Sequence, residues 1–298
     1  MKSRCLLLVH AHPDDESIFT GATMAKYAAE GARVTLVTCT RGERGSIPKN
    51  HPAAQAGDRP RGESRLAQVG SLRAKELEAA CTQLGVTEQW YLGGPGRWRD
   101  SGPGRHYDPR AFCYAELDEA ADELAALIHK VQPQVMVTYD ANGFYGHPDH
   151  IQAHLVAWRA YQQACDPLRT KFYALTIPRS VLADAINEAR RSWPDGRRQV
   201  ELGTATRILD TPDTFLQFGV PDDQVTTEIC ADSFLDVKIA ALKAHVTQIV
   251  VDDHFFHAAA LTRMRVLGTE HYTLLSHSGA GDTASYGQGR ENDLFCGM

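Results

Sequence analysis

Two short apolar runs with one helical stretch between them most constrain how this chain can fold. Residues 5–9 and 34–38 are continuous runs of apolar and β-branched residues, which are typical of parallel strands covered on both faces. Residues 16–30 carry apolar side chains at helical spacing, and Gly31 provides a stop signal. This order predicts a βαβ unit, and with it an α/β fold: a Rossmann-like, mostly parallel sheet with helices on both faces.

The same alternation continues along the chain and loosens after residue 166. We expect helices at 72–84, 116–131, 148–165, 180–192 and 232–248, and strands at 90–92, 134–139, 171–177 and 225–230. Residues 41–70 show no period and are expected to form a long loop over the sheet, and residues 279–298 a surface tail. We divide the 298 residues into a Rossmann-like catalytic core (1–169) and an appended smaller region with a closing helix (170–298), packed on the core.

Charge and cysteine usage narrow the function classes. Lys and Arg number 31 and Asp and Glu number 37, so the net charge is −6, unlike the basic footprint of a nucleic-acid-binding protein. No apolar run approaches the roughly 20 residues that span a bilayer, and the run at 5–9 is too short for a secretory signal. Seven cysteines without C-x-x-C spacing indicate reduced thiols. We therefore expect a cytoplasmic protein without nucleic-acid or membrane partners; a homo-oligomer is compatible with the sequence.

The first expected strand ends directly in a cluster of ligand-type side chains, residues 10–16 (His-Ala-His-Pro-Asp-Asp-Glu). In open α/β sheets, ligands bind at the carboxyl ends of the strands. A dinucleotide-binding turn would carry glycines here. Two histidines and three acids instead repel phosphate and suit a divalent cation, with Zn²⁺ favoured by the mixture of imidazole and carboxylate. Acids in a first helical turn also stabilise the helix dipole, but that explanation leaves His12 without a role.

A second cluster, residues 140–150, follows the expected strand 134–139, so two strand ends of one sheet can face each other. A catalytic zinc ion usually has three protein ligands and one open position. His12 and Asp15, at i and i+3, would supply two of them, and a histidine of the second cluster the third. The candidates for that third ligand are His147, His150 and His154, and spacing does not decide between them. His154 lies one helical turn further in and is better suited to a supporting or surface position.

The remaining polar groups fit amide hydrolysis. Asp14, beside the ligands, could take a proton from water activated by the metal. A histidine that is not a ligand could stabilise the oxyanion or, protonated among the neighbouring acids, protonate the leaving amine. Tyr145 is a candidate hydrogen-bond donor to the oxyanion.

Two motifs carry a resemblance to a known family. Residues 12–15 (His-Pro-Asp-Asp) before a helix, paired with residues 147–150 (His-Pro-Asp-His), resemble the LmbE-like (PIG-L) zinc-dependent N-deacetylases. Residues 238–248 are also similar to the C-terminal helix of that family. The resemblance therefore extends over most of the chain.

The resemblance implies roles for individual residues of the two clusters. It implies a site for Zn²⁺, which Fe²⁺ can also occupy, with His12, Asp15 and His150 as ligands. It further implies that Asp14 is the catalytic base and His147 the polarising histidine.

Within the family, residues 72–77 and 91–102 most resemble the branch that removes acetate from N-acetylglucosaminyl-inositol in the mycothiol pathway. That branch implies that Arg73 and Asp100 hold polar groups of the sugar and inositol, and that Tyr145 serves the oxyanion. We therefore expect zinc-dependent hydrolysis of the N-acetyl amide of an amino sugar.

Three alternatives remain beside this function. Two are enzymes of the same chemistry: a mycothiol S-conjugate amidase, or a deacetylase of an acetylated amino-sugar antibiotic intermediate. The third is a sugar-binding protein that retains the metal site. Asp14 argues against the third, because a binding site needs no spare base beside its ligands.

Overall fold

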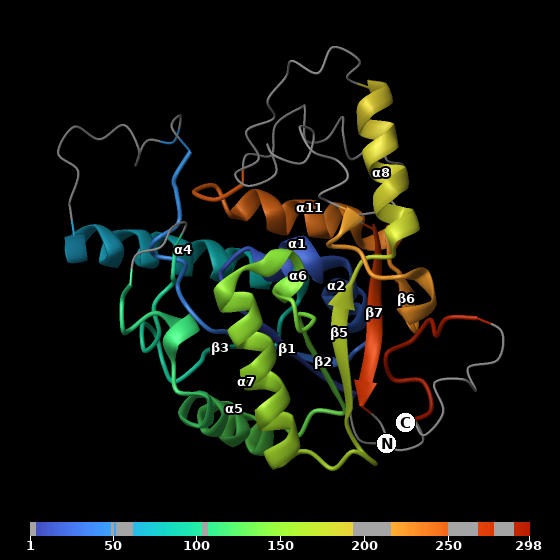
Figure 1. Ribbon diagram of the computed structural model, residues 1–298, viewed down its shortest axis with the longest axis horizontal. Coiled ribbons are helices and arrows are strands. Elements are labelled where there is room, and N and C mark those ends of the chain that lie inside the picture. Colours follow the sequence, from blue (N-terminus) through green and yellow to red (C-terminus); the bar gives the residue numbers. More distant parts are fainter. Residues whose placement is uncertain are drawn as a thin grey trace.

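The computed structural model of the protein describes residues 4–48, 51, 62–102, 107–192, 216–249, 268–276 and 289–298. Figure 1 shows a single sheet with helices packed around it. The strands are β1 (Cys5–His10), β2 (Arg33–Thr38), β3 (Glu88–Tyr91), β4 (Val135–Thr138), β5 (Lys171–Thr176), β6 (Thr227–Cys230) and β7 (Thr269–Ser276). The helices are α1 (Asp15–Phe19), α2 (Gly21–Ala29), α4 (Gly62–Leu84), α5 (Leu117–Val131), α6 (Gly143–Gly146), α7 (Pro148–Ala164), α8 (Arg179–Ser192) and α11 (Leu235–Ala244).

The sheet has the order β3-β2-β1-β4-β5-β7-β6. Strands β1 to β5 run parallel, whereas β7 is antiparallel to both β5 and β6. The strand order reverses between β1 and β4, where Leu6 lies opposite Val135. Such a switch point is the place where ligands bind in open α/β sheets.

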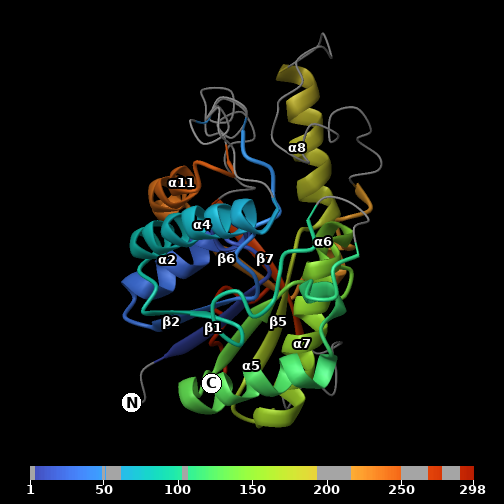
Figure 2. The same ribbon diagram turned by 90° about the vertical axis from the view of Figure 1, so that its left-hand side faces the viewer.

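Helices cover both faces of the sheet, as Figure 2 shows: α5 and α7 pack together on one face, and α2, α4 and α11 on the other. Strands β1, β4 and β5 are consequently buried along their whole length. This burial explains why the corresponding sequence runs are continuously apolar rather than alternating. The predicted Rossmann-like, mostly parallel α/β class is confirmed.

The helix expected at 16–30 is in fact two helices. α1 ends at Phe19, and Thr20 has a non-helical backbone (φ −134°) before α2 begins at Gly21. The Thr20 hydroxyl lies 2.9 Å from His10 Nε2, so the break ties the helices to the end of β1.

The loop expected at 41–70 is helical from Gly62 onward, because α4 begins there. Glu63 in the first turn of α4 forms ion pairs with Arg99 and Arg110, which anchor this end of the helix to the neighbouring loop.

The C-terminal region differs from the expectation in two respects. β7 was not predicted, although it lies between β5 and β6 in the sheet. Of the surface tail expected at 279–298, residues 279–288 lie outside the described residues, and the end is anchored to the core, since Leu294 and Phe295 are buried and the Phe295 ring centroid lies 5.3 Å from that of Tyr27. β5, β6 and β7 extend the sheet that the first half of the chain builds, so the boundary at residue 169 falls between neighbouring strands. The division into core and appended region stays a prediction.

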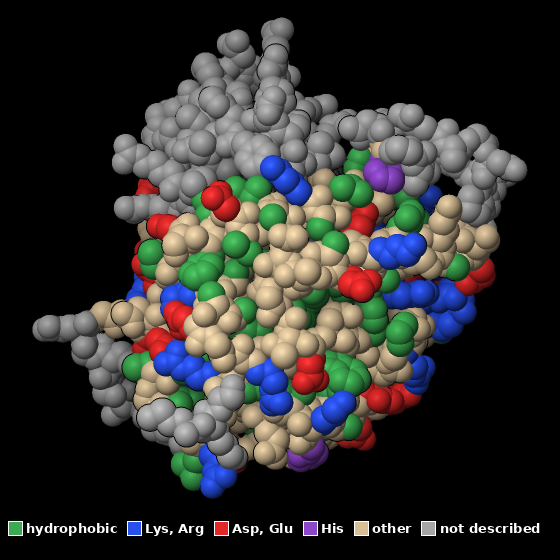
Figure 3. All heavy atoms as spheres, turned by 180° about the vertical axis from the view of Figure 1, so that it is seen from behind, with side chains coloured by type: hydrophobic (Ala, Val, Ile, Leu, Met, Phe, Trp, Pro, Cys, Tyr) green, Lys and Arg blue, Asp and Glu red, His purple; other side chains and the backbone are tan. Residues whose placement is uncertain are grey.

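No helix within the described ranges is long and apolar enough to cross a membrane. All seven cysteines are free thiols. Figure 3 shows acidic and basic side chains interspersed over the described part of the face opposite to that of Figure 1. The cytoplasmic location, the absence of nucleic-acid partners and the oligomeric state stay predictions.

Candidate metal centre and active site

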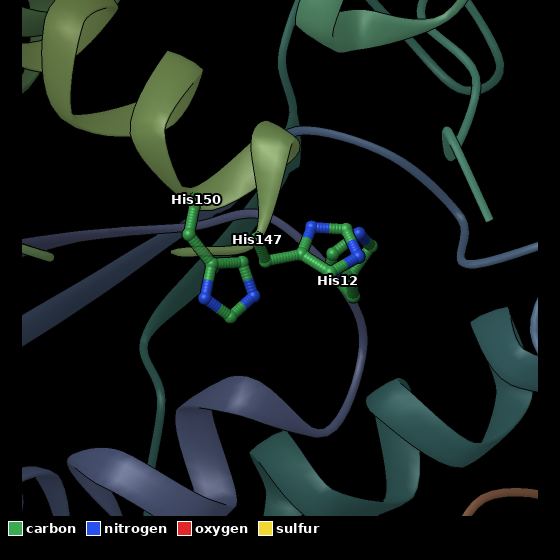
Figure 4. Close-up of side chains that lie close together, drawn as sticks. All are labelled: His12, His147 and His150. Atoms are coloured by element: carbon green, nitrogen blue, oxygen red, sulfur yellow. The ribbon is translucent and has the colours of Figure 1, made fainter. Parts of the chain in front are cut away.

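The two motif loops meet at the carboxyl ends of the neighbouring strands β1 and β4. One loop leads from β1 into α1, and the other leads from β4 through α6 into α7. Figure 4 shows His12 from the first loop beside His147 and His150 from the start of α7. The His12 ring centroid lies 4.7 Å from that of His147 and 5.3 Å from that of His150. The expectation that two strand ends face each other is confirmed.

His150 has one ring nitrogen occupied and one available. Its Nδ1 lies 3.2 Å from the carbonyl oxygen of Gly143, which fixes the ring proton on Nδ1 because a carbonyl only accepts. Its Nε2 is buried, has no hydrogen-bond partner among the described residues, and lies 3.4 Å from Asp15 Oδ2. A buried ring nitrogen and a carboxylate oxygen at this distance can share a cation, and a histidine held through its other nitrogen is the usual arrangement of a metal ligand.

His12 lies among three carboxylates. Its Nδ1 is 3.2 Å from Asp15 Oδ2, and its Nε2 is 3.1 Å from Asp149 Oδ2 and 3.6 Å from Asp100 Oδ1. Burial alone would lower the pKa of His12, but these acids raise it well above its usual value. The acids around His12 therefore favour a positive charge at this ring, which either a proton or a metal ion bound to the ring can supply.

The donor atoms at this site fit a divalent cation in overlapping groups. The described part of the chain contains two groups whose ligand atoms all lie within 4.8 Å of one another. One group is His12, His147 and His150; the other is His12, Asp100, His147 and Asp149. Asp15 Oδ2 contacts both His12 and His150, so the three predicted ligands also lie together. Imidazole and carboxylate donors in this mixture suit zinc or a similar metal. The choice of His12, Asp15 and His150 among these groups stays a prediction.

Asp14 has a strained backbone, with φ 111° and ψ −31°. A positive φ is uncommon for a residue with a side chain, and such strain is concentrated at functional sites. Burial and the neighbouring Asp15 carboxylate raise the pKa of Asp14 to about 7. A carboxylate with a pKa near the working pH suits the role of a general base.

The surroundings of His147 favour the neutral ring over the protonated one; its role as the polarising histidine stays a prediction. Burial and the neighbouring rings of His12 and His150 lower the pKa of His147 to about 4. Its Nδ1 accepts the backbone N–H of Asp149 at 3.2 Å, so the ring proton lies on Nε2. A neutral His147 can therefore donate a hydrogen bond to an oxyanion, but it does not carry the acidic proton of an imidazolium.

Tyr145 is half-buried beside the histidines, with its ring centroid 5.0 Å from that of His150. Burial and the carboxylates of Asp15 and Asp14 raise the pKa of the Tyr145 phenol. The phenol is thus neutral at ordinary pH, the form that can donate a hydrogen bond to an oxyanion.

Arg73 and Asp100 lie near the cluster but are engaged with loop backbone. Arg73, on α4, donates to the carbonyl oxygens of Gly42 and Ser46. Asp100 Oδ2 accepts the backbone N–H of Arg44 at 3.1 Å. Both side chains are buried. Their predicted role as substrate contacts stays a prediction.

Sequence reasoning missed Tyr139, which supports two predicted ligands at once. Its hydroxyl donates to Asp15 Oδ2 at 2.7 Å and accepts the backbone N–H of Ala11 at 2.9 Å. Its ring stacks on that of His150 at 4.1 Å. A tyrosine at the end of an apolar strand, directly before a polar cluster, was the available signal, because a buried hydroxyl needs a partner.

Asp149 was also missed. Its Oδ2 accepts the backbone N–H of Ser101 at 2.8 Å as well as contacting His12, and its Oδ1 accepts the N–H of Cys113 at 3.0 Å. It therefore links His12 to two further loops. His154 is buried with Nδ1 2.8 Å from the carbonyl oxygen of Tyr139, and it belongs to neither group of ligand atoms in the described residues.

The comparisons with known proteins show the family to which the chain belongs. The family model of the GlcNAc-PI de-N-acetylases (PIG-L) matches residues 7–161, the segment that contains both motif loops. A relative from Acidothermus cellulolyticus is 49% identical over 99% of this chain and 95% of its own. One from Thermobispora bispora is 46% identical over 100% of both chains. Both are named 1D-myo-inositol 2-acetamido-2-deoxy-alpha-D-glucopyranoside deacetylase.

A solved structure shares the fold. The zinc-inhibited form of teicoplanin deacetylase superimposes with a TM-score of 0.54 at 19% identity, covering 91% of this chain and 98% of that chain. The fold is thus shared with a solved deacetylase, and the relatives that cover nearly the whole chain are named as deacetylases. The chain belongs to the PIG-L family, and the resemblance inferred from the two motifs is confirmed.

Proposed function

We propose that this protein is a metal-dependent amidohydrolase that removes acetate from 1D-myo-inositol 2-acetamido-2-deoxy-alpha-D-glucopyranoside, the N-acetylglucosaminyl-inositol of the mycothiol pathway. Relatives with that name match this chain at 49% and 46% identity over nearly the full length of both proteins. The substrate is a neutral, polyhydroxylated amide, and an acidic metal site of this kind repels no part of it.

The observation that best supports a bound metal ion is the buried Nε2 of His150. This atom has no hydrogen-bond partner among the described residues and lies 3.4 Å from Asp15 Oδ2. We assign His12, Asp15 and His150 as the ligands. Zn²⁺ fits this set, and Fe²⁺ is the alternative occupant. When bound, the cation would supply Lewis-acid polarisation of the amide carbonyl.

The chain's own groups divide the proton transfers. Asp14 accepts a proton from the attacking water and returns it to the leaving amine, because it directly precedes the ligand Asp15 and its surroundings raise its pKa to about 7. His147 Nε2–H and the Tyr145 hydroxyl donate hydrogen bonds to the carbonyl oxygen as negative charge develops there. These roles require His147 and Tyr145 to be neutral, which their pKa shifts favour.

Arg73 and Asp100 are proposed to hold hydroxyl groups of the sugar and the inositol. Both side chains are buried and already form hydrogen bonds with loop backbone, since Arg73 donates to Gly42 and Asp100 accepts from Arg44. Substrate binding would therefore replace hydrogen bonds between these two side chains and the loop backbone with hydrogen bonds to hydroxyl groups of the substrate.

A substrate-profile assay tests the proposal. The protein is stripped with a chelator, reloaded with Zn²⁺ or Fe²⁺, and assayed for acetate release from N-acetylglucosaminyl-inositol. A mycothiol S-conjugate and an N-acetylated amino-sugar antibiotic precursor are assayed alongside. We expect no turnover without metal, and the highest kcat/KM for the inositol-linked sugar. A higher kcat/KM for another substrate would reassign the substrate, and sugar binding without any turnover would favour a binding protein.

A further inference from the structure

Glu16 and His245 form a buried pair to which the reaction above gives no role. Glu16 directly follows the predicted ligand Asp15, whereas His245 directly follows α11, 229 positions further along the chain. His245 Nε2 lies 2.7 Å from Glu16 Oε1, and neither side chain has exposed surface. A carboxylate removed from water in this way is stable only with hydrogen-bonding partners, so the contact is specific rather than incidental.

The second carboxylate oxygen of Glu16 reaches the backbone of the proposed base. Glu16 Oε2 accepts the N–H of Asp14 at 3.0 Å. Asp14 is the residue with φ 111°, and its strained conformation persists only where the surroundings fix it. The Glu16 carboxylate therefore lies between the Asp14 backbone and His245.

The hydrogen-bond directions beyond His245 are fixed by a second carboxylate. Gln248 Nε2 lies 3.3 Å from Glu76 Oε2 and 3.1 Å from His245 Nδ1. Because a carboxylate only accepts, the Gln248 amide NH₂ faces Glu76 and also donates to His245 Nδ1. The ring proton of His245 is then on Nε2 and is donated to Glu16.

Glu76 is itself held in place. Its two oxygens accept the backbone N–H and the hydroxyl of Thr247, at 2.9 and 2.8 Å. A continuous chain of hydrogen bonds thus runs from α4 through the turn after α11 to the loop that carries Asp14.

We propose that Glu16 and His245 are positioning residues for the base: together they fix the Asp14 backbone so that its carboxylate faces the attacking water. This inference rests on the proposed function, in which Asp14 is the base. Neither residue belongs to the groups of ligand atoms around His12 in the described chain. Their loss is therefore expected to slow turnover while metal and substrate still bind.

The same helix offers a matched control. Lys238 on α11 forms a buried ion pair with Glu270 at 2.7 Å, with both side chains almost unexposed. Glu270 also accepts the backbone N–H groups of Ala22 and Thr23 at the start of α2. The Lys238–Glu270 pair is thus as buried as the Glu16–His245 pair, but its hydrogen bonds go to α2 and not to Asp14.

The experiment compares four variants of the metal-loaded enzyme: His245→Leu, His245→Gln, Glu16→Gln and Lys238→Met. His245→Leu and Glu16→Gln are expected to lower kcat by roughly 10- to 100-fold, as for a slightly misplaced catalytic group, with KM and metal content unchanged. In Glu16→Gln the new NH₂ must face either Asp14 N–H or His245 Nε2–H, so one bond is lost. His245→Gln retains a donor near Nε2 and is expected to recover most of the rate. Lys238→Met is expected to lower Tm but keep kcat.

Several outcomes would overturn the proposal: a kcat loss in His245→Leu no larger than in Lys238→Met, no recovery in His245→Gln, or a loss of metal or a change in KM that accompanies the loss of kcat. If His245→Leu does not fold, Glu16→Gln and His245→Gln decide by the same criteria. Failure of the proposed function is distinguishable, because the wild-type enzyme itself would then release no acetate.

Discussion

The two loops that meet at the site differ in how firmly the protein holds them. In the first loop, residues 10–16, every side chain is buried except that of Asp14, which is half-buried. In the second, residues 140–147, Ala141, Asn142 and Gly146 are exposed, and the chain bends through Phe144 at φ 64°. The first loop is embedded in the core, whereas the second lies at the surface.

This difference matches the work proposed for each loop. The first supplies the base and two of the predicted metal ligands, whose positions relative to one another must not change. The second supplies Tyr145 and His147, which meet the carbonyl oxygen of an incoming substrate. Surface loops on a rigid scaffold commonly carry such contacts, because the substrate must reach them from solvent.

Removing a metal ligand beside either loop is expected to have the largest effect. His12→Ala in the first loop and His150→Ala, in the first turn of the helix after the second, should both lose the metal, with turnover falling below detection. Metal analysis of the purified variants and an acetate-release assay check this. His154→Ala, on the same helix as His150 but bonded to a carbonyl oxygen, should keep its metal. Full metal content in His150→Ala together with metal loss in His147→Ala would move the third ligand to His147.

Removing the base comes next. Asp14→Asn keeps the shape of the side chain but cannot accept a proton, so kcat should fall by roughly 10²- to 10⁴-fold. Metal content should stay at the wild-type level, because the substitution leaves His12 and Asp15 in place. Single-turnover kinetics on the metal-loaded variant measure the loss. Turnover close to wild type would mean that the first loop does not contain the base.

A smaller loss is expected from the second loop. Tyr145→Phe removes one oxyanion donor and should lower kcat by at most about 10²- to 10³-fold. Tm should stay unchanged, since Tyr145 is only half-buried in a loop with exposed neighbours. Parallel measurement of kcat and Tm tests both statements. A drop in Tm or in metal content would show that the second loop is as much a part of the core as the first.

The sequence predicted the α/β fold and the meeting of the two motif loops, because apolar runs and ligand-type residues are local signals. It missed β7, whose residues 269–276 include Glu270 and His271 and therefore look unlike a buried strand. The structure buries Glu270 against Lys238 on α11. The pattern of residues along one segment does not predict an ion-pair partner on a distant helix.

The same limit applies to the site. The motifs identified the residue types, but the neutral state of His147 depends on the burial and the rings that surround it. The contact between Glu16 and His245 joins residues 229 positions apart, and no local pattern announces it. The sequence did not predict the long-range hydrogen bonds that hold the side chains of the site in place.

The smallest expected effect tests the link between the two loops. Tyr139, at the base of the second loop, donates to Asp15 in the first and stacks on His150. Tyr139→Phe keeps the ring and its stacking, and it removes only the hydroxyl. Without that donor, Asp15 is oriented less firmly, so the metal dissociation constant should rise by roughly 10- to 100-fold, as for other lost partners of metal ligands. The unpaired N–H of Ala11 should also lower stability by about 1–3 kcal/mol.

Chelator competition measures the metal affinity, and activity at saturating metal should return to near the wild-type level. Tyr161→Phe is the control, because its buried hydroxyl donates to the carbonyl oxygen of Thr170 at 3.0 Å, at the far end of α7 from the metal site. It should lose stability without losing metal affinity. If Tyr139→Phe binds metal as tightly as Tyr161→Phe, the hydroxyl of Tyr139 does not help to position Asp15 for metal binding. The two loops would then keep their geometry independently of this contact.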